Sequence, residues 1–93
     1  MKVNEEFKRE FGRKLNFWRV EIRGWTRSDL AQHIGVSNST IAMYESGKRM
    51  PNLMMLVILA EALDVDADDL LPEVDYSVPT LEGQTNIFDV IGE

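Results

Sequence analysis

The sequence contains no cysteine, and this absence limits the chemistry that the chain can perform. Without cysteine there is neither a disulfide framework nor a thiolate metal site, which is typical of a protein kept in a reducing compartment. His33 is the only histidine, and the pattern predicts neither a phosphate-binding glycine loop nor a pocket of clustered carboxylates. We therefore expect no catalytic residue, no bound metal, no cofactor and no enzymatic activity.

Long apolar runs are also missing. No run approaches the ~20 residues that span a bilayer, and the N-terminal stretch MKVNEEFKRE has no apolar signal region. We expect a soluble, cytoplasmic protein without a membrane partner. With 93 residues, the chain lies near the lower size limit for a single hydrophobic core, so oligomerisation would be a natural source of additional stability.

Lysine and arginine are missing from the last third of the chain. Residues 1–63 contain all 10 Lys and Arg against 7 Asp and Glu, whereas residues 64–93 contain 9 acidic residues and no basic one. The net charge of −6 therefore conceals a first part with a balance of +3, which is compatible with a nucleic-acid partner. The acidic part is a solvated tail, a surface for a protein partner or a screen against non-specific DNA binding.

Apolar residues recur at helical spacing through most of the chain, which predicts an all-α fold. Asn4, Asn52 and Asp66 are candidate N-caps of a first, a fourth and a fifth helix, and Pro72 ends the fifth. The fourth helix is apolar nearly all round, so the tail or a second subunit should cover part of it. The predicted buried stripes are Phe7, Phe11, Leu15, Trp18 and Ile22 in the first helix and Leu53, Leu56, Leu59, Ala60 and Leu63 in the fourth.

The stretch TRSDLAQHIGVSNSTIAMYESGKR, residues 26–49, predicts the remaining two helices and a tight turn between them. Thr26 and Asp29 form a capping-box pattern at the start of the first, and Gly35 ends it. Ser37 is the candidate N-cap of the second. By spacing alone, this is either an ordinary helical corner or the geometry in which a second helix enters the major groove of DNA.

The residue types favour the second interpretation. From Leu30 to Pro51 the pattern L-A-x-x-I-G-V-S-x-x-T-I-x-x-x-E-x-G-K-R-x-P resembles the helix-turn-helix domain of the Cro and phage-repressor type, the XRE family. The pattern continues as L-x-x-L-A-x-x-L-x-V from Leu56 to Val65. The resemblance implies a compact five-helix, lambda-repressor-like DNA-binding domain over residues 1–71.

The resemblance also implies which side chains read the bases. Aligned with the family, the base-reading positions at the start of the second helix are Asn38, Ser39 and Met43. Asparagine can bond bidentately to adenine, serine can bond to several bases, and methionine can lie against a thymine methyl group. The alternative is a solvated helix start with a partly buried methionine.

Residues that bracket this helix in the family contact DNA phosphates. The matching positions are Arg27, where the family usually has a glutamine, and Thr40, Lys48 and Arg49. Such contacts position the protein and set the salt dependence of binding, but they do not select the sequence. For each side chain taken alone, simple solvation is the alternative.

Glu45 has the wrong charge for a surface that faces DNA. In the family, a glutamate here pairs inward with an arginine near the end of the first helix, as a structural strut. The nearest match is Arg19, but it lies one residue further from Gly24 than usual, and Val20 occupies the expected place. Pairing between Arg19 and Glu45 is therefore a hypothesis.

The last segment, residues 72–93, predicts an acidic and apolar C-terminal extended arm, because it contains prolines and lacks clear periodicity. Its apolar residues either fold back over the core or pair with another chain. The resemblance implies a sequence-specific transcriptional regulator, most simply a repressor that binds a two-fold operator in double-stranded DNA as a homodimer. The alternative is an antitoxin or adaptor that binds DNA and captures a protein partner through residues 73–93.

Overall fold

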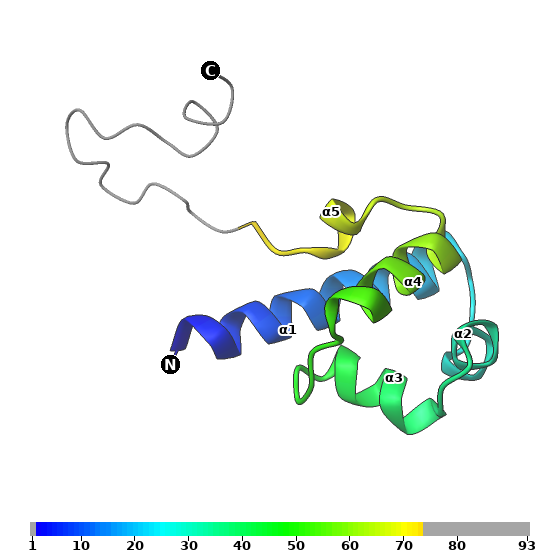
Figure 1. Ribbon diagram of the computed structural model, residues 1–93, viewed down its shortest axis with the longest axis horizontal. Helices are drawn as coiled ribbons and strands as arrows, with labels where there is room; N and C mark the ends of the chain where they lie inside the picture. The colour runs from blue at the N-terminus through cyan, green and yellow to red at the C-terminus, as the bar shows by residue number, and fades with distance from the viewer. Residues whose placement is uncertain (1, 74–93) are drawn as a thin grey trace, which may run out of the picture.

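The computed structural model describes the backbone of residues 2–73 and the side chains of residues 5–73. Within this part of the chain every regular element is helical, which confirms the predicted all-α fold of five helices (Figure 1). The predictions for the C-terminal arm, residues 72–93, concern residues that lie almost entirely outside the described part. The elements are α1 (Lys2–Phe17), η1 (Trp18–Ile22), α2 (Arg27–Ile34), α3 (Asn38–Glu45), α4 (Leu53–Leu63) and α5 (Ala67–Leu70).

The first helix differs from the prediction at both ends. It already includes Lys2, so Asn4 lies inside α1 and is not its N-cap. At its other end the helix continues as the single π-helical turn η1, in which Arg23 N donates to the carbonyl oxygen of Trp18 at 3.1 Å. A bond from residue i to i+5 places one more residue in the turn than an α-helix does. The side chains that follow are therefore rotated relative to the apolar stripe.

This rotation explains why Ile22, near the end of the helix, is exposed. Phe11 and Leu15 are fully buried, as the stripe predicts, but Ile22 is 53% exposed, so its predicted burial is wrong. Arg19 is also buried, and it follows Leu15 by four residues, on the same side of the helix. The extra residue of the π-helical turn follows Arg19, so the turn moves Ile22 off the inner face and leaves Arg19 on it.

The caps of the middle helices match the predictions. Thr26 Oγ1 accepts from Asp29 N at 3.0 Å, and Thr26 N donates to Asp29 Oδ2 at 2.8 Å, which completes the capping box of α2. Gly35 has φ of 77°, in the left-handed region that glycine adopts most readily, and this ends α2. Ser37 Oγ then accepts from Thr40 N at 3.2 Å and starts α3.

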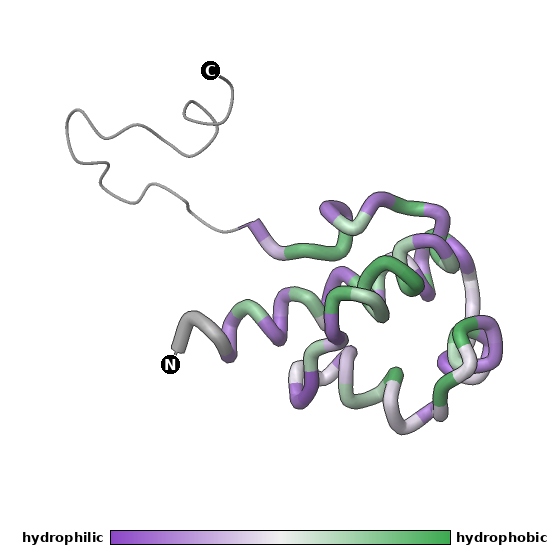
Figure 2. Tube along the Cα trace, viewed as in Figure 1, coloured by the Kyte–Doolittle hydropathy of each residue, from purple (hydrophilic) through white to green (hydrophobic). Residues whose placement is uncertain are grey.

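The fourth helix is capped by Asn52, whose Oδ1 accepts from Met55 N at 2.8 Å. Its hydropathy is high along nearly its whole length (Figure 2). Leu53 is 77% exposed rather than buried, because the inward stripe of α4 begins at Leu56. The buried apolar core consists of Phe11, Leu15, Leu30, Ala31, Ile41, Tyr44, Leu56, Leu59, Ala60, Leu63 and Leu70.

The helices are arranged around α1, which contacts α3 on one side and α5 on the other (Figure 1). The second helix packs on both α3 and α4. Trp18 Nε1 donates to the carbonyl oxygen of Asp69 at 3.1 Å, which joins η1 to α5. This arrangement holds α3 at the edge of the domain, away from the acidic residues of α5. None of the helices in the described residues has the length and hydropathy required to cross a bilayer.

Candidate DNA interface

The third helix presents one face to the core and another to solvent. Ile41 and Tyr44 are buried, and they anchor α3 against the rest of the domain. Asn38 and Ser39 are exposed in its first turn, and Met43 is 36% exposed. The predicted base-reading side chains therefore share the solvent-facing part of α3, where their polar and thioether atoms are accessible to a ligand.

Thr40 lies less openly than the other predicted phosphate contacts. Its side chain is half-buried, and its Oγ1 lies 3.0 Å from Ser37 Oγ. The hydroxyl groups of both residues thus take part in the N-terminal cap of α3. Thr40 can still offer a hydroxyl to a phosphate, but in this structure its hydroxyl contacts the N-cap residue Ser37 at the start of α3.

Lys48 and Arg49 lie on the turn that follows α3. Their backbone N–H groups both donate to the carbonyl oxygen of Met43, at 3.0 and 3.3 Å, so the turn folds back on the end of the helix. Both side chains are exposed. Two cationic side chains are therefore held beside the solvent-facing part of α3 by the backbone of the turn.

Arg27 is the first residue of α2, and its side chain is 49% exposed. Its Nε donates to Glu45 Oε1 at 3.0 Å. The sequence resemblance implies a phosphate-binding role for Arg27 but gives no indication of this contact. The structure thus places Arg27, a predicted phosphate contact, in direct contact with Glu45, the predicted structural strut.

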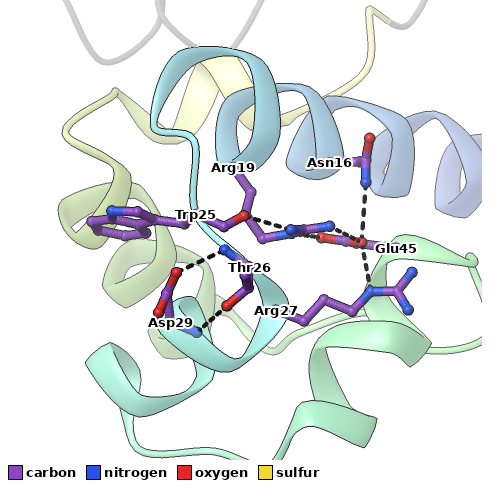
Figure 3. Close-up of polar contacts among 7 residues, drawn as sticks. All are labelled: Asn16, Arg19, Trp25, Thr26, Arg27, Asp29 and Glu45. Carbon is purple, nitrogen blue, oxygen red and sulfur yellow. Dashed lines mark hydrogen bonds and ion pairs between the residues drawn. The ribbon is translucent and has the colours of Figure 1, made fainter.

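The four polar side chains that meet at the end of α3 are called the Glu45 cluster: Asn16, Arg19, Arg27 and Glu45 (Figure 3). Arg19 Nε lies 2.5 Å from Glu45 Oε2, and a terminal nitrogen of Arg19 lies 3.0 Å from Oε1. Asn16 Nδ2 donates to Oε1 at 3.3 Å. The other terminal nitrogen of Arg19 donates to the carbonyl oxygen of Trp25 at 2.7 Å. The hypothesised pairing of Arg19 with Glu45 is therefore present, and it joins η1 to α3.

The Glu45 side chain is 3% exposed, yet its carboxylate is held in the ionised form. Burial alone would raise the pKa of Glu45. Hydrogen bonds from Arg19, Arg27 and Asn16, together with the charge of Arg19, outweigh that effect and hold the pKa below its ordinary value of 4.5. The cluster is consequently a charged, fully paired strut at neutral pH.

One member of this arrangement is not evident from the sequence. Asn16 has no signal in the helical pattern, because an exposed asparagine on a helix is most simply solvated. The sequence predicts the inward pairing of Arg19 only as a hypothesis, because Val20 holds the usual position. The π-helical turn places one extra residue between Arg19 and Gly24, which accounts for the offset of Arg19 from the usual spacing.

A family model described as "Helix-turn-helix" matches residues 18–70, which is more than half of the chain. The chain belongs to this helix-turn-helix family. It is 31% identical over 62 residues to the uncharacterised HTH-type transcriptional regulator YazB of Bacillus subtilis, covering 67% of this chain and 88% of that one. It is also 38% identical over 45 residues to the transcriptional repressor RstR of a cryptic phage in Vibrio cholerae, covering 48% of this chain and 40% of that one.

Solved structures show the same architecture. The restriction-modification controller protein C.AhdI from Aeromonas hydrophila superposes with a TM-score of 0.63 at 30% identity, over 68% of this chain and 94% of that one. The DNA-binding domain of BldD superposes with a TM-score of 0.66 at 24% identity, over 73% and 97% of the two chains, and supports the fold alone. The family is thus one of helix-turn-helix proteins whose relatives matched here are named as transcriptional regulators, and this chain shares their DNA-binding fold.

Proposed function

We propose that the chain is a sequence-specific repressor that binds a two-fold operator in double-stranded DNA as a homodimer. The observation that carries this proposal is the division of α3, which anchors Ile41 and Tyr44 in the core and leaves Asn38 and Ser39 exposed in its first turn. A recognition helix enters the major groove with its N-terminal residues on the base edges. In this assignment Asn38, Ser39 and Met43 read bases.

The proposed phosphate contacts come from either side of α3. Arg27, at the start of α2, and Lys48 and Arg49, after α3, carry exposed positive charge. Thr40 adds a hydroxyl at the start of the helix. Positive groups that bracket a recognition helix fix the register of the protein on the duplex without reading the sequence. Arg19 and Glu45 act behind this surface as the strut.

The distribution of acidic residues supports the same orientation. Within the described residues, Asp64, Asp66, Asp68 and Asp69 lie on or next to α5, whereas α3 lies on the other side of α1 (Figure 1). DNA that contacts α3 would therefore stay away from these carboxylates, and repulsion between them and the phosphates would be weak at physiological salt.

Dimerisation is proposed because one such domain reads only a few base pairs, and because α4 exposes apolar side chains. Leu53 and Met54 are 77% and 73% exposed, and Val57 lies on the same helix with 46% exposure. A contiguous exposed apolar surface on a small domain is typical of a protein contact. The arm, residues 72–93, is the other proposed contact, either with a second copy or with a different protein.

Selection of bound duplexes from a random pool tests the proposed function. We expect a consensus with two-fold symmetry and half-sites about one helical turn apart. A consensus without symmetry would contradict the dimer, and no enrichment would contradict sequence-specific binding. Analytical ultracentrifugation of the chain truncated after residue 71 tests the arm, because a truncated chain that still dimerises and binds as tightly would exclude a role for the arm in dimerisation.

A further inference from the structure

The Glu45 cluster contains two guanidinium groups for one carboxylate, and the two groups are used differently. Arg19 is buried and directs all its described contacts inward, to Glu45 and to the carbonyl oxygen of Trp25. Arg27 is half exposed, and its contact with Glu45 uses Nε only. Figure 3 shows the terminal nitrogens of Arg27 on the side of its guanidinium group away from Glu45.

The charges of the cluster do not cancel. One carboxylate compensates one guanidinium group, so Arg19, Arg27 and Glu45 together carry one excess positive charge. Since Arg19 is buried with its hydrogen bonds satisfied, the excess charge is accessible to a ligand only at Arg27. A guanidinium group that uses Nε on one side still presents a planar pair of donors on the other, which matches the geometry of a phosphate.

We propose that Glu45 is a positioning residue for DNA binding, which holds Arg27 in the orientation that contacts a backbone phosphate. This inference rests on the proposed DNA-binding function. A free arginine side chain loses much of its rotamer freedom when it binds, whereas Arg27 has already lost part of that freedom through its bond to a buried carboxylate. Preorganisation of this kind increases affinity without adding a contact.

The proposal makes a prediction whose sign is opposite to that of simple electrostatics. Glu45→Gln removes a negative charge from just behind the proposed DNA-binding surface, so charge alone would tighten binding to a polyanion. If Glu45 positions Arg27, the same change instead weakens binding. We expect a rise in Kd of about tenfold for the selected duplex, which corresponds to the loss of one well-formed charge-assisted hydrogen bond. Tighter binding by the Glu45→Gln variant would overturn the proposal.

A second pair of variants leaves the bond between Arg19 and Glu45 intact. Arg27→Lys keeps the charge, but a single ammonium group cannot hold Glu45 and present two coplanar donors to a phosphate. We expect Arg27→Lys to raise Kd about tenfold with an unchanged salt slope. Arg27→Gln should also lower the slope of log K against log salt concentration by ~0.9, the value for one phosphate contact. An Arg27→Lys variant that binds as tightly as the original chain would refute the inference.

Arg49 provides the matched control, since its exposed side chain is a proposed phosphate contact but is not part of the Glu45 cluster. In double-mutant cycles, Glu45→Gln should raise the Kd of the Arg27→Lys variant by less than about twofold. It should raise the Kd of the Arg49→Lys variant as much as it raises the Kd of the original chain. Additive effects in both cycles would show that Glu45 acts on the whole fold and not through Arg27.

A measurement without DNA separates this inference from the proposed function. In the free protein, ¹⁵N relaxation of arginine Nε–H groups should find Arg27 ordered and Arg13 mobile, because the Arg13 side chain is 76% exposed and its surface pair with Glu10 uses a terminal nitrogen and not Nε. Glu45→Gln should make Arg27 as mobile as Arg13. If Arg27 is ordered but no duplex binds, the proposed function fails and the role in binding fails with it. If duplexes bind but Arg27 is as mobile as Arg13, only the positioning role is overturned.

Discussion

Gly12 in α1 lies against the backbone of Glu45 at the end of α3. A Cβ atom at position 12 would overlap the carbonyl group of Glu45 and would lie 2.8 Å from the carbonyl oxygen of Tyr44. The first and third helices therefore meet at a point where only a hydrogen atom fits. This close approach brings the Glu45 side chain within reach of Arg19 and Asn16 on the same long helix.

Gly12→Ala should destabilise the domain, although alanine is the better helix former by about 1 kcal/mol. The added methyl group meets backbone atoms, which cannot move aside as a flexible side chain can, so we expect a loss of about 1–3 kcal/mol in the free energy of unfolding. Urea denaturation measures this loss. The control is Gln32→Ala, at an exposed position of α2, which should stay within about 0.5 kcal/mol of the original chain.

Glu45→Ala should reduce stability and DNA binding together. The substitution leaves the Arg19 guanidinium group buried without its carboxylate, and breaking a buried ion pair in this way costs about 3–5 kcal/mol. The exposed pair between Glu10 and Arg13 is the control, since Glu10→Ala should change stability by less than about 1 kcal/mol. Normal stability of Glu45→Ala in a urea melt would show that the ion pair between Arg19 and Glu45 does not stabilise the fold.

Acid should weaken the fold through Glu45. The pKa of Glu45 is lower in the folded protein than its ordinary value of 4.5, so ionised Glu45 stabilises the folded state. This contribution is fully present above about pH 4.5 and is lost as the pH falls through the folded-state pKa. The stability difference between the original chain and Glu45→Gln, measured by urea denaturation from pH 3 to 7, should therefore shrink toward low pH. A difference that is independent of pH would contradict this assignment.

The proposed base-reading residues and the proposed phosphate contacts should respond differently to substitution. Asn38→Ala should cost about 1–3 kcal/mol on the selected duplex and relax the preference at one base pair. Lys48→Ala should weaken binding to all duplexes about equally and lower the salt slope by ~0.9. Titrations of the selected duplex and its single-base variants at several salt concentrations distinguish these outcomes. Loss of base preference in Lys48→Ala would contradict the assignment of Lys48 as a phosphate contact.

How far the sequence predicts this structure depends on the range of the interactions involved. The cap residues Thr26, Ser37 and Asn52 are predicted correctly, because each bonds to a backbone group three residues away. The contact between Arg27 and Glu45 joins positions 18 residues apart on different helices, and no local pattern reports it. The exposure of Ile22 is missed because a constant helical period is assumed through η1, where the period changes.

The π-helical turn itself leads to the last prediction, which concerns deletion of Val20. Deleting this exposed residue removes the extra position from η1 and places Arg19 four residues before Gly24, where a regular α-helix would point it at Glu45. We therefore expect the deletion to preserve the ion pair and to change the free energy of unfolding by less than about 1 kcal/mol, within the range of ordinary single changes.

Deletion of the exposed Arg13 is the matched control for this experiment. It lies in the regular part of the helix, so its loss would rotate Phe11 by about 100° relative to Leu15 and remove one of them from the core. That variant should lose about 3 kcal/mol or more, as large core truncations do. Equal losses for the two deletions in urea denaturation would show that η1 is required in its π-helical form. A much smaller loss for the Val20 deletion would identify η1 as a tolerated one-residue insertion that keeps Arg19 against Glu45.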